Sequence, residues 1–266
     1  MDILIHTLSG TCTAAFIATF SKTNTKSRLA MVLLGSLAGA LPDIDAISLW
    51  SKFDKTIGQL LHLTHSGSEI YFGKFWYSHH GFFHSLFAAA LFACIFISIR
   101  KLFFTTVSWK PYLYALQTKL LLATFFFSYI AHLIGDLPTP GAVWGGIRLF
   151  FPFEVYVGGY GTTWWWNNYD VFVVLAVTAA SLITLLSLQS KFFQKDLILL
   201  VTACYVGCMG ACFYFVTHHS ISFAYNGNTS RYAYYERISK IDQIERIGPR
   251  LYFKIAYLDK KFPFYF

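Results

Sequence analysis

The chain has 266 residues, of which 56% are hydrophobic and only 13% are charged, and its mean hydropathy is +0.50. Soluble domains carry about 25% charged residues, so this composition excludes an ordinary soluble protein and predicts an integral membrane protein. The net charge of +8 does not call for a nucleic-acid partner, because most basic residues lie in short loops between apolar segments or after residue 217.

Six windows are apolar and long enough to be helices that cross a bilayer, which requires roughly 20 residues per span. In chain order they are Ile3–Phe20, Leu29–Trp50, Phe82–Ile99, Tyr112–Gly135, Val171–Leu188 and Leu197–Thr217. The first window lacks a basic stretch before it and a small-residue cleavage motif after it, so we expect it to be retained rather than cleaved as a signal peptide. The sequence predicts an all-α polytopic membrane protein, with a transmembrane domain over residues 1–217.

Basic residues in the loops predict the orientation, because short cytoplasmic loops are enriched in Lys and Arg. The loops after the first, third and fifth windows contain eight such residues. The longer loops 51–81 and 136–170 contain only Lys52, Lys55, Lys74 and Arg148. We therefore expect both termini and the two longer loops on the extracytoplasmic side.

Ionisable residues gather at the ends of four windows that this orientation places on the extracytoplasmic side. They are His6 in the first, Asp43 and Asp45 in the second, His79, His80 and His84 in or just before the third, and His132 and Asp136 at the end of the fourth. Ionisable groups at membrane depth cost about 2.5–3.5 kcal/mol each, so a group of them needs a compensating partner. A metal ion is the partner that these residue types predict.

The spacing of these residues also suits a metal. His80 and His84 are four residues apart, as are His132 and Asp136, so each pair is expected to project from one face of a helix. Imidazole and carboxylate are the ligands of catalytic zinc sites, and bridging carboxylates allow two ions about 3.5–4 Å apart. We expect one or two Zn²⁺ ions, or another divalent metal. A cation or proton transporter with the same ligands is the alternative, and a scaffold with a structural zinc is a third.

Other polar and aromatic residues have simpler interpretations. We expect the loop residues His62 and His65 to be solvated or interfacial, and His218 and His219 merely to follow the last window. The residues expected to be small packing residues between helices, rather than metal ligands, are Cys204, Gly207, Cys208, Gly210 and Cys212. The aromatic residues of loop 136–170 predict an interfacial belt; they are Trp144, Trp164, Trp165, Trp166 and Tyr169. A lid or lipid entrance formed in part by Trp164–Trp166 is compatible with this belt.

Five short motifs occur in order along the chain: MDILIHTLSG, ALPDID, HHGFFHS, HLIGDLPTPGAVWGG and RLFFPF. In this order they resemble the YdjM-like family of bacterial inner-membrane metal-dependent hydrolases, over roughly residues 1–153. The resemblance implies an integral protein of the bacterial inner membrane with a metal-dependent hydrolase activity. That family is in turn distantly similar to zinc-dependent phospholipases C.

The more distant similarity implies particular ligands. Those enzymes bind zinc through an ordered series of His, Asp, His and HxxxD, which His6, Asp45, His84 and then His132 with Asp136 match in this chain. Asp45 and Asp136 would then bridge the ions or orient a water molecule as catalytic groups. The ligands of a third ion have no match here. The family usually reads HRGxTHS, whereas His80 and Phe83 replace the Arg and Thr, so either His79 or His80 is the ligand, as is either Asp43 or Asp45.

A zinc site at the outer membrane interface suits a substrate whose scissile bond lies at the level of the lipid headgroups. We therefore expect cleavage of a phosphate ester or phosphodiester in a lipid-like substrate, as by a phospholipase C or a lipid phosphatase. Arg148 is the one basic residue of loop 136–170 and is a candidate phosphate ligand. Residues 218–266 form an extracytoplasmic tail, in which alternating aromatic residues and the turn signals Asn226-Gly227 and Gly248-Pro249 predict a small β-rich element.

Overall fold

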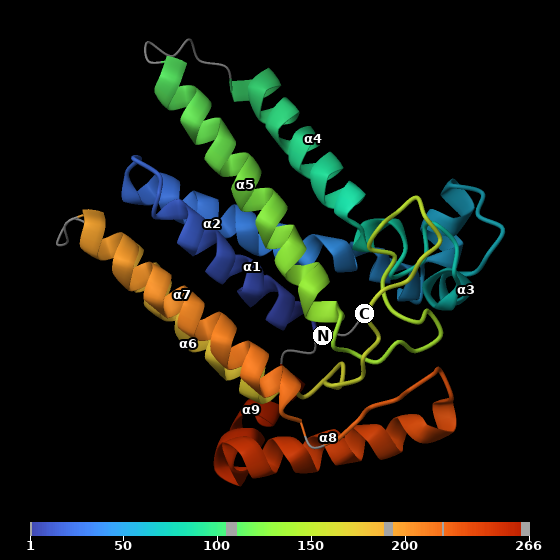
Figure 1. Cartoon of the computed structure of the whole chain (residues 1–266). Coiled ribbons are helices and arrows are strands. Elements are labelled where there is room, and N and C mark those ends of the chain that lie inside the picture. The colour runs from blue at the N-terminus through green and yellow to red at the C-terminus, as the bar shows by residue number, and fades with distance from the viewer. Residues whose placement is uncertain (1, 105–110, 189–193, 220, 262–266) are drawn as a thin grey trace.

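A computed structural model of the chain describes residues 2–104, 111–188, 194–219 and 221–261, and the regular elements in these ranges are helices (Figure 1). The longer ones are α1 (Ile3–Ala18), α2 (Thr25–Ala40), α3 (Gly67–Phe72), α4 (Leu86–Phe104), α5 (Pro111–Asp136), α6 (Tyr169–Ser187), α7 (Gln194–Thr217), α8 (Tyr232–Ile247) and α9 (Pro249–Lys261). Short helical segments are η1 (Leu41–Leu49), η2 (Asp54–Gly58), η3 (Phe82–His84) and η5 (Thr229–Arg231).

Four helical stretches are long and apolar enough to cross a membrane: Thr25–Leu49, Gln117–Asp136, Tyr169–Ser187 and Gln194–Thr217. They coincide with four of the six predicted windows. The first window falls on α1, whose 16 residues correspond to about 24 Å of helix, less than the ~30 Å hydrocarbon core. The third window falls on α4. The fold is therefore the predicted helical one, with four supported spans, and a count of six stays a prediction.

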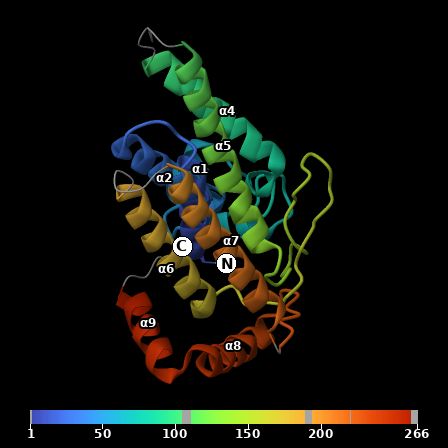
Figure 2. The ribbon, with the colours of Figure 1, turned by 60° about the vertical axis from the view of Figure 1, so that its left-hand side comes forward.

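Helix α1 is the centre of the bundle, where it packs against α2, α5, α6 and α7 (Figures 1 and 2). Its contact with α2 depends on glycines. A Cβ atom added at Gly10 would lie 2.4 Å from the Gly35 carbonyl oxygen, and one added at Gly39 would lie 2.6 Å from the His6 carbonyl oxygen. Only glycine permits such a close approach of the two helices. This approach places His6 next to the end of α2.

The glycines of α7 do not have the packing role that we predicted from the sequence. A Cβ atom at Gly207 or Gly210 would meet nothing within 4 Å. Cys208 does lie buried in the core of the bundle with Cys12, as a small packing residue should. The close helix approach is instead made by the glycines of α1 and α2, where the backbones themselves touch.

Three helix ends are shaped locally so that they meet at one end of the bundle. The Asp2 carboxylate caps α1 by accepting hydrogen bonds from the Leu4 and Ile5 amides, at 2.8 and 3.1 Å. After α2, Pro42 has no N–H to continue the α-helical hydrogen bonds, and the chain continues as the 3₁₀ helix η1. Helix α5 ends at Asp136, two residues before Pro138 and one residue beyond the predicted window.

The described residues of the C-terminal tail do not form the predicted β-rich element. Their regular elements include the helices α8 and α9, which lie across the end of the bundle (Figures 1 and 2). The buried residues of α8 are Tyr235, Ser239, Asp242 and Gln243. Their spacing follows one face of a helix, and this periodicity outweighs the local alternation of aromatic residues. The Gln243 side chain fixes α8 to α6 by accepting a hydrogen bond from the Asp170 amide at 3.0 Å.

We predict that Gly39→Ala lowers the free energy of unfolding by about 1–3 kcal/mol, because the added methyl group forces α1 and α2 apart. The matched variant Gly207→Ala meets open space and should be as stable as the wild type or slightly more stable. Thermal unfolding of both proteins in detergent, followed by tryptophan fluorescence, measures the difference. Equal midpoints for the two variants would contradict the packing role of Gly39.

Candidate metal centre

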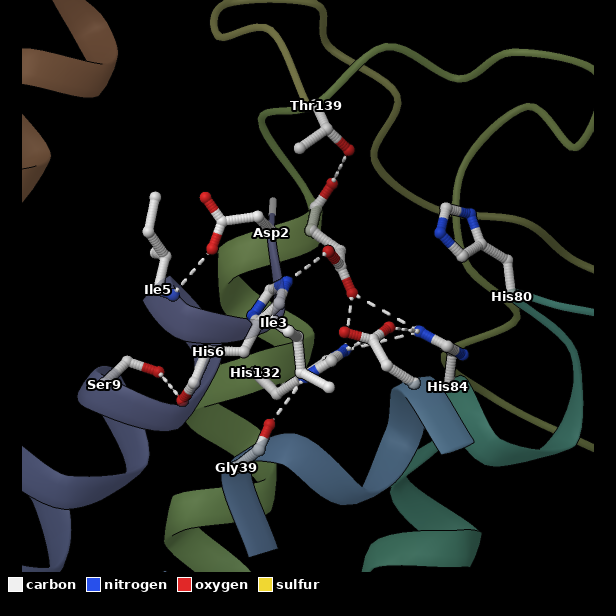
Figure 3. Close-up of polar contacts among 12 residues, drawn as sticks. Asp2, Ile3, Ile5, His6, Ser9, Gly39, His80, His84, His132 and Thr139 are labelled. Carbon is white, nitrogen blue, oxygen red and sulfur yellow. Dashed lines mark hydrogen bonds and ion pairs between the residues drawn. The ribbon is translucent and has the colours of Figure 1, made fainter. Parts of the chain in front are cut away.

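All eight predicted ligands lie at the same end of the bundle, brought there by α1, η1, the loop before η3, η3 itself and α5. Within the described residues, three overlapping groups have donor atoms within 4.8 Å of one another: His6, His132 and Asp136; Asp43, His84 and His132; and His79, His80 and His84. In Figure 3, His6, His84 and His132 converge from three segments, and His80 lies farther from their common centre.

His132 has the hydrogen-bond pattern of a metal ligand. Its Nδ1 atom lies 2.7 Å from the Gly39 carbonyl oxygen, which can only accept, so Nδ1 carries the proton and donates it. In a neutral imidazole Nε2 is then left with a free lone pair, and the residue is fully buried. A backbone carbonyl that accepts a hydrogen bond from the other ring nitrogen, and so fixes the tautomer, is a usual partner of a zinc-bound histidine.

Four donor atoms surround one point beside His132. The His132 Nε2 atom is 3.3 Å from His84 Nε2, 3.0 Å from Asp136 Oδ2 and 3.6 Å from Asp43 Oδ1. His84 Nε2 is 3.5 Å from Asp43 Oδ1 and 3.6 Å from Asp136 Oδ2. Two donors that share a tetrahedral zinc ion at about 2.0–2.2 Å lie roughly 3.3–3.6 Å apart. Four of these five separations fall in that range and the fifth, 3.0 Å, is shorter, so the arrangement is close to that of a single shared cation.

His6 extends this arrangement to the other oxygen of Asp136. Its Nε2 atom lies 3.0 Å from Asp136 Oδ1 but without hydrogen-bond geometry, and its ring stacks on His132 with centroids 3.7 Å apart. Asp136 thus presents one oxygen to His84 and His132 and the other to His6. A carboxylate in this position can bridge two ions.

The structure distinguishes Asp43 from Asp45. Asp43 faces the ring nitrogens of His84 and His132, whereas Asp45 lies on the other side of His84, with Oδ2 3.5 Å from His84 Nδ1 and Oδ1 2.6 Å from His79 Nδ1. The phospholipase-like series placed Asp45 among the ligands. The geometry instead gives that place to Asp43 and makes Asp45 the orienting partner of two histidines.

His80 and His84 do not form the helical face that the sequence predicted. Helix α4 begins only at Leu86, and His80 has a φ angle of 64°, in the left-handed region. Its Nδ1 atom donates a hydrogen bond to the Gly146 carbonyl oxygen at 3.1 Å. The i, i+4 argument therefore fails for His80 and His84, but it holds for His132 and Asp136, which share a face of α5.

Burial and neighbouring charges separate the protonation states of two histidines. Burial, together with the charges of His79 and His84, holds the pKa of His80 well below its usual value, so its imidazole is neutral. Burial also lowers the pKa of His84, but hydrogen bonds and charge from Asp43, Asp45 and Asp136 outweigh it and raise this pKa to about 10. Without a cation His84 therefore holds a proton against the carboxylates, and a metal would replace that proton.

Arg148 does not have the role that we predicted for it. Its Nε and Nη2 atoms donate hydrogen bonds to the carbonyl oxygens of Phe153 and Pro152, at 2.9 and 2.7 Å, and its backbone amide donates to the His80 carbonyl oxygen at 2.8 Å. The side chain is buried in this loop and does not line the cavity at the cluster. Arg148 positions the segment around His80, and we remove it from the candidate phosphate ligands.

Two aromatic residues border the cluster, and sequence reasoning did not place either of them in the site. The Tyr71 ring stacks on His79 with centroids 4.4 Å apart, and the Trp144 ring lies 4.5 Å from that of His80. Trp144 Nε1 donates a hydrogen bond to the Tyr71 carbonyl oxygen at 2.9 Å. The motif GAVWGG contains Trp144 and could have pointed to it, whereas nothing in the sequence singled out Tyr71.

A cavity of about 480 Å³ opens beside the cluster. Its polar wall contains Asp43, His79, His80 and Asp136. Aromatic residues form much of the remainder, including Trp165 and Trp166 of the predicted belt and Tyr225 and Tyr232 of the tail. Residues of the tail thus line the cavity beside the candidate metal centre, and the aromatic loop contributes part of its wall. Trp164 is instead fully buried, packed on Phe223.

The four remaining histidines lie outside the three groups. His62 and His218 are exposed, and His65 packs on an aromatic ring. His219 donates a hydrogen bond from Nδ1 to Asp242 Oδ2 at 2.7 Å and so links the end of α7 to α8. None of them has the donor geometry of the main cluster.

Residues 1–219 match the family described as YdjM inner membrane protein. The chain belongs to this YdjM family. The match contains all eight ligand candidates and extends beyond the motifs on which the resemblance rested. It also places the protein in a lipid bilayer, in agreement with the apolar helices. No curated protein and no solved structure matches the chain. The family match ends before α8 and α9, although residues of the tail line the cavity.

We predict that the protein binds a divalent metal such as Zn²⁺ in detergent and that His132→Ala lowers the metal content at least tenfold, because this side chain belongs to two of the three groups. His62→Ala is the control, since His62 is exposed and outside the cluster. Metal analysis after size-exclusion chromatography, with Zn²⁺, Mn²⁺ and Mg²⁺ offered in turn, tests this. Equal metal content in the two variants would show that the cluster is not the binding site.

Proposed function

We propose that this YdjM-family protein is a membrane-embedded metal-dependent hydrolase that cleaves a phosphate ester or phosphodiester in a lipid-like substrate. The observation that carries the proposal is the convergence of His84 Nε2, His132 Nε2 and Asp136 Oδ2, with Asp43 Oδ1 beside them, around one buried point. These atoms would hold one Zn²⁺ ion. His6, together with the second oxygen of Asp136, would contribute to a neighbouring ion.

Zinc in this site would polarise a phosphate oxygen and make water a nucleophile at neutral pH. The protein's own residues hold and orient the reacting groups. His79 lines the cavity and is oriented from behind by Asp45, which lies 2.6 Å from its Nδ1 atom. This is the arrangement of a general acid–base histidine whose carboxylate partner fixes its tautomer. Asp45 then positions His79 and His84. Asp136 joins the two ligand groups, because one of its oxygens faces His84 and His132 and the other faces His6.

The lining of the cavity supports a phosphate ester as substrate. Two carboxylates face it, and the part of the chain that the structure describes contributes no Lys or Arg to its wall. An anionic phosphate group would be repelled by these carboxylates unless a cation neutralised them. The aromatic remainder of the wall suits the apolar and headgroup portions of a lipid, because Trp and Tyr prefer the membrane interface.

The orientation of the loops supports an extracytoplasmic site. The turn between α1 and α2 carries Lys22, and the first turn of α2 carries Lys26, at the end of the bundle opposite the candidate metal centre (Figure 1). Basic residues favour the cytoplasmic side. The metal centre would then open toward the extracytoplasmic side of the inner membrane, where a lipid substrate in the outer leaflet can reach it.

We predict that the purified protein releases phosphate or a phosphorylated headgroup from at least one member of a lipid panel, and that two carboxylate variants fail differently. Asp43→Asn should lose metal and activity together. Asp45→Asn should retain most of the metal but lose about 10²–10⁴-fold in kcat, the usual contribution of general acid–base catalysis. Glu154→Gln is the control, because its side chain is 91% exposed and lies outside the cavity.

The same preparation separates hydrolysis from transport. Proteoliposomes that retain metal but release nothing from any lipid, and that move cations or protons in a metal-dependent manner, would replace the hydrolase by a transporter. Bound metal without release or transport would favour a structural zinc.

We predict that Ser68→Cys in intact cells with a permeabilised outer envelope reacts with a membrane-impermeant maleimide, and that Lys22→Cys reacts only after lysis. Both positions are exposed, on opposite ends of the bundle. The unsubstituted protein gives the background from its own cysteines. The reverse labelling pattern would place the metal centre on the cytoplasmic side.

A further inference from the structure

A second cavity lies on the other side of His6, between helices that span the membrane. Helices α5 and α7 both pack against α1 but hardly touch each other. The space between them is a groove of about 780 Å³, with α1 as its floor and the first turns of α6 at one side. It is open toward the surroundings, since Phe127 and Ile134 on one wall and Phe213 on the other are exposed.

The two walls are continuous apolar faces. Helix α5 lines the groove at helical spacing from Ala123 to Gly135, and α7 does so from Tyr205 to Thr217. Each stretch covers 12 residue steps, or about 18 Å along the helix. The hydrocarbon region of one leaflet is about 15 Å thick, half of the ~30 Å core. The groove therefore has the length of one lipid chain in one leaflet.

The few polar groups along the groove already have partners. Ser9 Oγ donates a hydrogen bond to the His6 carbonyl oxygen at 2.8 Å, and Thr13 Oγ1 donates to the Ser9 carbonyl oxygen at 2.9 Å. Thr13 Oγ1 also lies 3.1 Å from the Tyr205 hydroxyl. Away from its end at His6, whose ring nitrogens have no hydrogen-bond partner, the described lining of the groove thus offers mainly hydrocarbon and paired hydroxyl groups, which disfavours a polar ligand over most of its length.

The end of the groove nearest the metal centre is different. Tyr160 and Thr162 of the aromatic loop form its rim, and Gly135 lies so close to His6 that an added Cβ atom would be 3.1 Å from His6 Cε1. The groove is therefore apolar along its length, polar at the rim and closed at this end by His6. A membrane lipid has the same order of chemistry from tail to headgroup.

We propose that this groove binds one hydrocarbon chain of a membrane lipid, with the lipid headgroup at the rim beside Tyr160. The surrounding bilayer supplies the chain, and its methylene groups fill an apolar space that water would occupy only at a cost. The lipid chain packs next to His6 and separates the buried ligand cluster from the bilayer. This site does not depend on the proposed hydrolysis, since its lining shares no residue with that of the other cavity, although His6 is also a candidate ligand.

The test uses vesicles that contain a phospholipid with a diazirine near the end of one acyl chain. After illumination, cross-links should concentrate on the groove faces of α5 and α7. Ala131→Trp fills the groove and should reduce these cross-links at least fivefold, and the milder Ala131→Leu should reduce them in part. Ala180→Trp, an equal change at an exposed position of α6 outside the groove, should leave them unchanged.

Cross-links spread evenly over the outer faces of the helices, or unaltered by Ala131→Trp, would overturn the proposal. So would efficient cross-linking of Met209→Cys to a second copy of the chain, because the groove would then be a subunit interface. Elution of each variant as a single symmetrical peak in size-exclusion chromatography shows that it is folded. The photochemical result requires no turnover, so it distinguishes failure of the lipid site from failure of the hydrolase.

Discussion

The burial of the Asp45 and Asp136 carboxylates, with Asp43 half-buried beside them, next to several imidazoles is the constraint on which the rest of the structure depends. Carboxylates removed from water need partners, and each of these has at least one histidine within 3.6 Å. Because the partners belong to different segments, α1, η1, η3 and α5 must all end at the same level. The packing of the helices therefore determines which side chains meet at this end of the bundle.

The glycines of α1 and α2 allow these helix ends to come close together. At Gly10 and Gly39 the backbones of α1 and α2 lie very close together. In this position the Gly39 carbonyl oxygen is the partner of His132 Nδ1, and α1 places His6 nearby. A larger residue would move the carbonyl and the histidine together. Close packing of α1 against α2 thus holds the Gly39 carbonyl oxygen where it fixes the tautomer of His132, a proposed metal ligand. Helix packing and ligand chemistry therefore depend on the same contact.

The sequence predicted the helical class and the eight candidate ligands because both depend on local signals: apolar length for the helices, and ionisable residues at window ends for the site. It did not predict which carboxylate faces the shared point, because Asp43 and Asp45 differ only in where the turns of η1 direct them after Pro42. Nor did it find Tyr71, which contacts His79 only through tertiary packing. The prediction of a β-rich tail was wrong because the alternation of aromatic residues is a weaker signal than burial against α6 and the aromatic loop.

The distribution of polar groups also bears on the kind of function. A conduction path requires polar side chains at successive depths, whereas here they gather at one end, and the groove that continues from His6 toward the other end is apolar with its hydroxyl groups already paired. His6 and Asp136 thus lie between the aromatic cavity with its carboxylates and the apolar groove. Because the ionisable side chains of the cluster gather at one end, the arrangement favours the proposed lipid hydrolase over a transporter with the same ligands.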